Sequence, residues 1–375
     1  MLKTVMNFCF FARRKRRNDM KEFKYWDNEF SQQNMALFNS DEISGEIYLK
    51  VRSIYRKDLL DKLVTLNKLE NKPSMEELYN LVCSNKISIH QLNNFIDAEK
   101  KNDLDFYKSN FELIRGELFK VQHYSWGGDQ VNSLDKKIVS IIKSNYSYDD
   151  IISQIDNQIK SNVERYTLNS WYNNWSSSLT EYLFKKEDRV FPALGKIKSV
   201  DFFIDNIPLD LKITFFPQGY LKFKRKTNEV TELKKLGRKY GCSFDIKESD
   251  DLIKYQISEQ LKNMSNAVAL QELNALLKEN TDIINDSLSN PSELIHWLYE
   301  NQGEMRFGSE NRLFLILVDR NSLPNSWKLK RDFNLQEKVI SDYIIKFKKS
   351  SLRNVDFNFK GKRYTSLADC IFILT

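Results

Sequence analysis

From about residue 40 to residue 150, apolar residues recur three or four positions apart, which predicts helices. The clearest helix is predicted over 74–83, where Ser74 followed by Glu77 is a capping-box pattern. A second helix is predicted over 87–97, close behind the first. The pair fits an ordinary helical hairpin or a helix-turn-helix that reads DNA. Because no base-reading residue can be identified, the pattern favours the hairpin.

After about residue 187 the spacing of apolar residues changes from the helical period to the strand period. A helical stretch over 148–187, which we expect to break near Thr167, comes before this change. Strands are predicted over 189–194, 199–204, 207–214, 312–319, 355–360 and 370–375. A basic loop is expected after the third strand, and helices are predicted over 248–265, 291–302 and 333–349. Helices mixed with a few strands predict an α/β fold.

The stretch 200–214 predicts a hairpin that turns at Asp205-Asn206, because both residue types tolerate a positive φ. Counting outward from the turn places Asp201 opposite Asp210, with Cβ atoms about 5 Å apart. Side-chain alternation then gives one wholly apolar face, formed by Val200, Phe202, Ile204, Ile207, Leu209 and Leu211. The other face carries the two aspartates, together with Phe203, Pro208 and Lys212.

Two directly opposed carboxylates repel each other unless a cation lies between them. Mg²⁺ would suit this position, since it binds one or two carboxylates together with water and a substrate phosphate. Without a cation, we expect one of the two acids, Asp201 or Asp210, to hold its proton unusually tightly. Lys212 shares their face, where its ammonium group can reach a metal-bound water or a phosphate oxygen. The pattern therefore favours a site over a solvated face that carries charges by chance.

Composition narrows the remaining possibilities. The chain is 41% hydrophobic and 29% charged, which is typical of a globular protein, and its net charge of +7 is compatible with nucleic acid without requiring it. The 4 cysteines and 3 histidines are widely separated, which argues against a disulfide framework, a zinc site and a histidine-metal nuclease. No GxxxxGK[ST] loop is present, so the sequence predicts no ATP-driven motor.

The N-terminus has an apolar run, Val5–Ala12, followed by a basic run, Arg13–Arg17. This order is the reverse of a signal peptide, and the apolar run is too short to cross a membrane. We therefore expect a cytoplasmic protein with no membrane partner. The basic run could contact phosphates, although a solvated terminus is the simpler interpretation.

Asp201, then Asp210-Leu211-Lys212, on consecutive strands after a helix, resembles the motif of the PD-(D/E)xK, or restriction-endonuclease-like, nuclease superfamily. Val200 stands where that family often has a proline. The family often adds a glutamate from the preceding helix, and Glu181 lies at that place. The weaker alternatives are Glu164 and Glu187, and an exposed ion-paired glutamate is the simpler interpretation of all three. The resemblance covers about residues 175–320.

The resemblance implies a Mg²⁺-dependent endodeoxyribonuclease of a restriction or phage-defence system, in which Mn²⁺ can replace Mg²⁺. Asp201, Asp210 and the backbone carbonyl of Leu211 would hold the metal, with Glu181 as a further ligand. Lys212 would orient the attacking water and stabilise charge on the phosphate. The residues with a catalytic role would thus be Asp201, Asp210, Lys212 and Glu181, whereas Leu211 would be a metal ligand only.

The resemblance also implies a domain organisation. Residues 148–375 would form the nuclease domain, a mixed sheet flanked by helices. Residues 1–147 would form a mainly helical domain that reads the target or contacts a partner. Because cutting both strands favours two sites, a homodimer or a defence-system partner protein is expected.

Basic residues are concentrated just after the motif, which favours DNA as the partner. Residues 196–240 contain 11 lysines and arginines but 5 aspartates and glutamates. Such residues give sequence-independent, salt-sensitive affinity for phosphates, although two solvated basic loops would look the same. The candidates are Lys222, Lys224, Arg225, Lys226, Lys234, Lys235, Arg238 and Lys239.

Two other functions remain open at this point. One is a nuclease directed at RNA or at a particular nucleic-acid structure. The other is a nucleic-acid-binding subunit that keeps the nuclease fold without activity. The complete set of two acids and a lysine argues against the inactive subunit.

Overall fold

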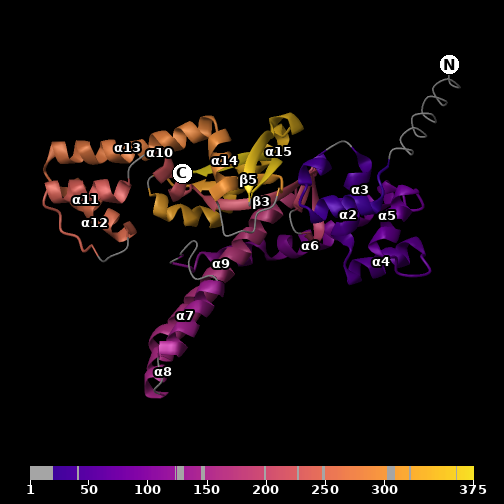
Figure 1. The fold of residues 1–375 in the computed structure, drawn as a ribbon, viewed down its shortest axis with the longest axis horizontal. Coiled ribbons are helices and arrows are strands. Elements are labelled where there is room, and N and C mark those ends of the chain that lie inside the picture. Colours follow the sequence, from indigo (N-terminus) through magenta and orange to yellow (C-terminus); the bar gives the residue numbers. More distant parts are fainter. Residues whose placement is uncertain are drawn as a thin grey trace.

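A computed structural model describes most of the chain as a mixed α/β protein. The described residues are 20–39, 42–122, 124, 131–144, 148–197, 200–225, 228–246, 250–301, 309–320, 322–359 and 361–375. Figure 1 shows a central sheet with a group of N-terminal helices at one end and a helical bundle at the other. A helical arm projects from the middle of the molecule.

The N-terminal helices pack around one aromatic-rich core. Their bounds are α2 (Phe23–Ser31), η1 (Met35–Asn39), α3 (Ile43–Ile54), α4 (Lys57–Asn67), α5 (Met75–Cys83) and α6 (Ile89–Leu118). The predicted capping box is confirmed, with both reciprocal hydrogen bonds between Ser74 and Glu77. The prediction of 87–97 is too short, because α6 runs for 30 residues and brings Leu118 into the core beneath the sheet.

The projecting arm consists of α7 (Val131–Ser144), α8 (Tyr148–Gln154), a π-helical turn η2 (Ile155–Ile159) and the start of α9 (Lys160–Lys185) (Figure 1). The break predicted near Thr167 is wrong. Thr167 lies inside α9, where its hydroxyl donates to the carbonyl of Val163 at 2.8 Å. The helix therefore accommodates this β-branched residue, whose hydroxyl bonds to the preceding turn.

Within the described ranges, six strands form one open mixed sheet in the order β1-β2-β3-β4-β6-β5. Strands β1, β2 and β3 pair antiparallel, β4 lies parallel to both β3 and β6, and β5 pairs antiparallel with β6. The bounds are β1 (Val190–Ile197), β2 (Val200–Ile204), β3 (Ile207–Phe215), β4 (Arg312–Val318), β5 (Arg353–Phe359) and β6 (Lys362–Leu374).

Helices cover both faces of the sheet. One face packs against α9, η3 (Leu323–Arg331) and α15 (Phe333–Lys346), and η4 (Lys349–Ser351) follows them. The opposite face packs against α14 (Ser292–Asn301). Every residue of β4 is buried, which explains its continuous apolar run.

The segment between β3 and α14 differs most from the sequence prediction. The prediction of a basic loop after β3 is wrong, because these residues form two helices, α10 (Gln218–Arg225) and α11 (Glu229–Lys239). With α12 (Asp250–Asn263) and α13 (Ala267–Ser289), α11 encloses a separate small core. The predicted helix over 248–265 is therefore present as α12 but packs in this bundle. The helix that packs on the sheet before β4 is α14.

The predicted hairpin is confirmed. Asp205 and Asn206 form its two-residue turn, with φ values of 49° and 66°. The observed pairs include Phe202 with Leu209, as the outward count requires. One detail of the predicted faces is wrong, because Val200 packs with Phe203 against the N-terminal helices. The second face of the hairpin is therefore partly buried by another layer of the protein.

Across the described ranges, no helix combines the length and the apolar character needed to cross a membrane. The basic run Arg13–Arg17 lies outside the described residues.

Candidate active site

Asp201 precedes Phe202, which pairs with Leu209 at the end of the β2–β3 ladder. Beyond that pair, the Asp201 carboxylate accepts a hydrogen bond from the backbone N–H of Leu211 at 2.8 Å. The side chain of Asp201 therefore links β2 to β3 next to Asp210.

The Asp201 carboxyl is the most strongly perturbed acid at this place. Burial, followed by the negative charges of Asp210 and Glu181, raises its pKa from 3.8 to about 7. The hydrogen bond from Leu211 and the charge of Lys185 lower this pKa, but by less than the other causes raise it. The three predicted acids are thus close enough to interact. The expectation that one acid of the hairpin holds its proton tightly agrees with this pKa.

Glu181 reaches the site from the last turns of α9. Its carboxylate lies 2.9 Å from the ammonium of Lys185, one turn further along the helix. Of the two alternatives, Glu164 is exposed, and Glu187 accepts a hydrogen bond from Ser341 at 2.6 Å. Of the three glutamates, Glu181 is the one whose charge is among the main causes of the raised pKa of Asp201, which favours Glu181 as the helix-borne acid.

Asp210 already has a buried cationic partner. The guanidinium of Arg312, a residue only 3% exposed, donates to Asp210 Oδ2 at 3.2 Å and to Glu310 at 3.3 Å. Arg312 opens β4, the neighbour of β3 in the sheet. Arg312 was not among the predicted site residues, although a cation at the start of a uniformly apolar strand was a usable signal.

A second lysine lies near Lys212. Lys330 in η3 is fully buried, and its ammonium donates to the side-chain carbonyl of Asn173 on α9. Burial and the nearby charge of Lys212 lower the pKa of Lys330 to about 7. Lys330 and Asn173 were missed because η3 carries several lysines and the sequence does not show which one is buried.

The donor set is compatible with a magnesium site completed by substrate. Within the described part of the chain, no group of three or more His, Cys, Asp or Glu side chains is arranged to hold a metal. Mg²⁺ commonly binds through one or two carboxylates, waters and substrate phosphates. Burial, and then the charges of Asp210 and Glu181, raise the pKa of Asp201, and a cation bound nearby would lower it. Asp201, Asp210 and the Leu211 carbonyl would offer oxygen ligands of the kind that Mg²⁺ and Mn²⁺ take.

The predicted nucleic-acid-binding residues differ in their surroundings. Lys222, Lys235 and Arg238 are exposed and have no ion pair within the described ranges. Lys224, Lys234 and Lys239 form surface ion pairs with Glu293, Asp250 and Glu272. Such exposed pairs are weak and can be exchanged for phosphate contacts. Lys226 lies outside the described residues.

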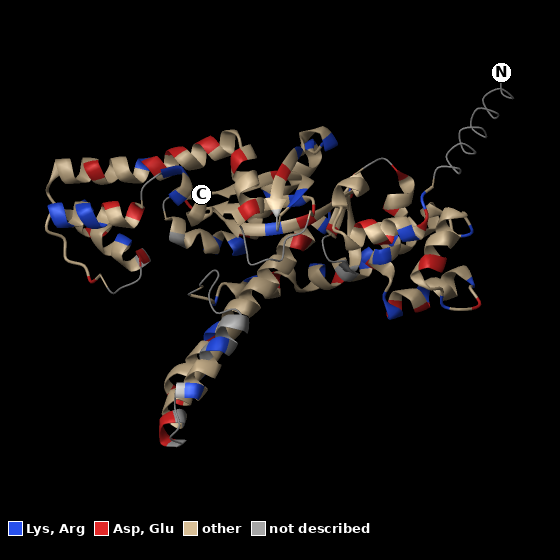
Figure 2. Cartoon of the chain, viewed as in Figure 1, with Lys and Arg blue, Asp and Glu red and all other residues tan. Residues whose placement is uncertain are grey.

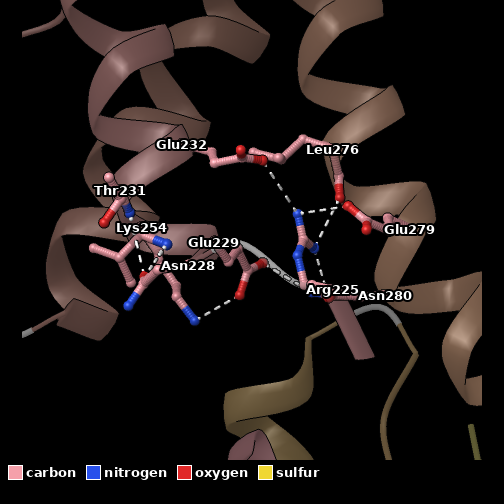
Figure 3. A network of polar contacts seen from close by, with 10 residues as sticks. Arg225, Asn228, Glu229, Thr231, Glu232, Lys254, Leu276, Glu279 and Asn280 are labelled. Atoms are coloured by element: carbon pink, nitrogen blue, oxygen red, sulfur yellow. Dashed lines mark hydrogen bonds and ion pairs between the residues drawn. The ribbon is translucent and has the colours of Figure 1, made fainter. Parts of the chain in front are cut away.

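Arg225 has a structural role in place of the predicted nucleic-acid contact. Its side chain is 1% exposed and donates to Asn280 at 2.6 Å and to the carbonyl of Leu276 at 3.2 Å (Figure 3). Glu279 lies 3.1 Å from the same guanidinium. Asn280 in turn donates to Glu229 at 2.8 Å, so the network joins α10, α11 and α13. A guanidinium enclosed in this way cannot contact a phosphate.

The basic residues of α11 follow the acid pair closely in the sequence but lie in a different part of the structure. Figures 1 and 2 show α11 and its lysines and arginines in the bundle, at the end of the molecule opposite the N-terminal helices. The acid pair lies beside Val200 and Phe203, which pack against those N-terminal helices. The basic residues of α11 would therefore contact a nucleic acid away from the acid pair.

Comparisons with protein-family models, curated proteins and solved structures found no match for this chain.

Proposed function

We propose that this protein is a Mg²⁺-dependent endodeoxyribonuclease with a restriction-endonuclease-like core, acting in a restriction or phage-defence system. The observation that carries the proposal is the electrostatic interaction of Asp201 with Asp210 and Glu181. Burial, followed by repulsion from the other two acids, raises the pKa of Asp201 to about 7. A group of acids that destabilise one another persists where the site has a use for their charge.

The order of elements around the acids supports the same family. Helix α9 precedes the strands and carries Glu181, β2 carries Asp201, and β3 carries Asp210 and Lys212. The strand that follows the crossover, β4, lies parallel to β3, with Asp210 paired to Arg312. This is the arrangement expected of the PD-(D/E)xK motif on a mixed sheet.

Each residue has a chemical role in phosphodiester hydrolysis. Asp201, Asp210 and the Leu211 carbonyl would hold Mg²⁺, with Glu181 as a further ligand. When bound, Mg²⁺ supplies Lewis-acid polarisation of the phosphate and a lower pKa for a bound water. Lys212 would hold a phosphate oxygen and stabilise the negative charge that develops on it. Arg312 would keep the Asp210 carboxylate in place through its hydrogen bond.

Residues 148–375 would form the catalytic domain, and residues 1–147 would read the target or contact a partner protein or a second copy. DNA is the proposed partner. The exposed Lys222, Lys235 and Arg238 offer phosphate contacts outside the acid site.

Plasmid cleavage with Mg²⁺ tests this function. Wild type should cut, and Asp210→Ala and Lys212→Ala should each lose at least about a hundredfold in rate. Asp205→Ala is a matched control, because that aspartate lies in the turn of the same hairpin and pairs with Arg189 on the surface. Equal activity in all four proteins would refute the assignment of the site.

A catalytically inactive nucleic-acid-binding subunit is the second candidate, and the ion pair of Arg312 with Asp210 favours it. A guanidinium already balances one of the acids and could replace the metal as a structural cation. Binding of DNA and of RNA without cleavage of either, at any Mg²⁺ or Mn²⁺ concentration, would support this function. Cleavage of RNA but not DNA would instead identify an RNA-directed nuclease.

A further inference from the structure

A cavity of about 410 Å³ lies between α9 and η3, outside the acid site. Its size falls within the range of pockets that bind small organic groups. Its lining combines two aromatic residues with cationic and amide side chains, among them Tyr124, Trp327, Arg165, Lys328, Asn169 and Asn325.

The aromatic wall of the cavity is held firmly. The ring of Tyr124 lies 6.0 Å from that of Trp327 and 4.9 Å from that of Tyr172. The Tyr172 hydroxyl donates to the Trp327 carbonyl at 3.0 Å, and both residues are buried. Fixed aromatic rings at the side of a cavity suit the flat face of a nucleobase, whatever the base.

The polar lining includes a donor that the protein does not use. The side-chain amide nitrogen of Asn169 is buried and has no hydrogen-bond partner within the described ranges. Leaving such a group unsatisfied is unfavourable, so an acceptor on a ligand would stabilise it. The edges of nucleobases present acceptors of this kind. Arg165 and Lys328 are exposed at the same cavity, where cations favour a phosphate.

The position of the cavity connects it to the proposed catalytic residues. Asn169 lies one turn before Asn173 on α9, about 6 Å along the helix axis. Trp327 lies three residues before Lys330 on η3, and Lys330 donates to Asn173. The charge of Lys212 contributes to the lowered pKa of Lys330, so the two ammonium groups lie close enough to interact. The cavity therefore shares two elements, α9 and η3, with the contact that links Lys330 to Asn173.

We propose that the cavity receives one unpaired nucleotide of the strand bound at the site. Its base would lie against Tyr124 and Trp327 with Asn169 bonded to the base edge, and its phosphate would lie near Arg165 and Lys328. The inference rests on the proposed function for the presence of a strand. It adds a substrate class, namely single-stranded or locally opened nucleic acid.

Binding without divalent metal tests the cavity separately from cleavage. The probes are short fluorescent single strands of DNA and RNA and the matching DNA duplex, measured by anisotropy over a series of salt concentrations. Asn169→Leu and Lys328→Gln should each weaken single-strand binding about five- to tenfold, with a smaller effect on the duplex. Lys328→Gln should also lower the salt slope by about 0.7. Lys160→Gln, an exposed lysine on the same helix outside the cavity, should bind like wild type.

The outcomes separate the two proposals. Wild-type affinity for single strands in both cavity variants, with unchanged thermal unfolding, would overturn the nucleotide pocket even if the plasmid is cut. Weakened binding in both variants, with no cleavage by wild type, would support the pocket while refuting the nuclease. Tighter binding of DNA or of RNA by wild type, weakened in both cavity variants, would support the pocket and identify the preferred sugar.

Discussion

Replacement of Asp201 by asparagine should stabilise the metal-free protein at alkaline pH. The carboxyl has a folded-state pKa of about 7 against an ordinary value of 3.8. Because the folded state holds this proton more tightly than the unfolded state, stability is highest at acid pH and falls as pH rises from about 4 to 7. The rise in pKa corresponds to about 4 kcal/mol, of which about 3 kcal/mol is lost between pH 5 and pH 8.

Asparagine removes this penalty and keeps an oxygen that can accept the hydrogen bond from Leu211. Asp201→Asn should therefore gain about 3 kcal/mol on wild type when the pH is raised from 5 to 8. If the chain unfolds in one transition, this gain corresponds to about 4 °C in Tm. Differential scanning calorimetry in a chelating buffer at a series of pH values measures it directly.

Two comparisons make the assay specific. Asp205→Asn, on the same hairpin but exposed, should keep the wild-type pH dependence. Mg²⁺ should stabilise wild type at pH 8 by mass action but have little effect on Asp201→Asn. A difference between Asp201→Asn and wild type that stays constant from pH 5 to pH 8 would refute the reasoning, because Asp201 would then not be the group that titrates.

Three further substitutions test the scaffold. Gly45→Ala should destabilise the N-terminal helices by about 1–3 kcal/mol in a denaturant titration, because an added Cβ would lie 2.9 Å from the ring of Trp26. Ser74→Ala should cost about 1 kcal/mol in the same titration through loss of the cap of α5. Arg225→Leu should cost about 2–3 kcal/mol, since Asn280 and neighbouring acceptors lose their donor, and it should leave the salt dependence of DNA binding unchanged. A lower salt slope for Arg225→Leu would contradict its structural role.

The sequence predicted the hairpin well because two independent local signals agree there. The Asp205-Asn206 turn determines which residues pair, and a one-residue slip would move the apolar face away from the core. The same logic located β4, whose uniform apolar run reflects burial on both faces. Both features depend on nearby residues, which is why they could be predicted without the rest of the fold.

The bundle between β3 and α14 was predicted poorly for a physical reason. The charges of α11 suggested a loop, yet Val230 and Leu233 lie on one side of the helix and are buried against α12. Two buried residues in a highly charged helix are a weak signal, and tertiary packing decides the outcome. Arg225 was misassigned for a related reason, because the sequence gives its charge but not its burial.

The candidate site was predicted as far as neighbouring strands could define it. Asp201, Asp210 and Lys212 follow from the hairpin, and Glu181 follows from the family resemblance. The partners that most affect their charges, Arg312 and Lys330, come from segments more than 100 positions along the chain. Parallel pairing of β3 with β4 brings Arg312 to Asp210. The sequence marks Arg312 as an unusual cation at the start of an apolar strand, but it does not show which strand lies beside it.

The charge balance of the site connects the proton, the metal and the substrate. Arg312 balances Asp210 and Lys185 balances Glu181, whereas Asp201 has a backbone N–H as its hydrogen-bond donor. A phosphodiester brought alongside would add negative charge and raise the pKa of Asp201 further, so that nucleic acid alone favours the protonated acid. A divalent cation has the opposite effect and must displace that proton to bind. Through the proton on Asp201, metal and substrate therefore oppose each other, whereas the direct attraction between a divalent cation and the phosphate favours binding of both together.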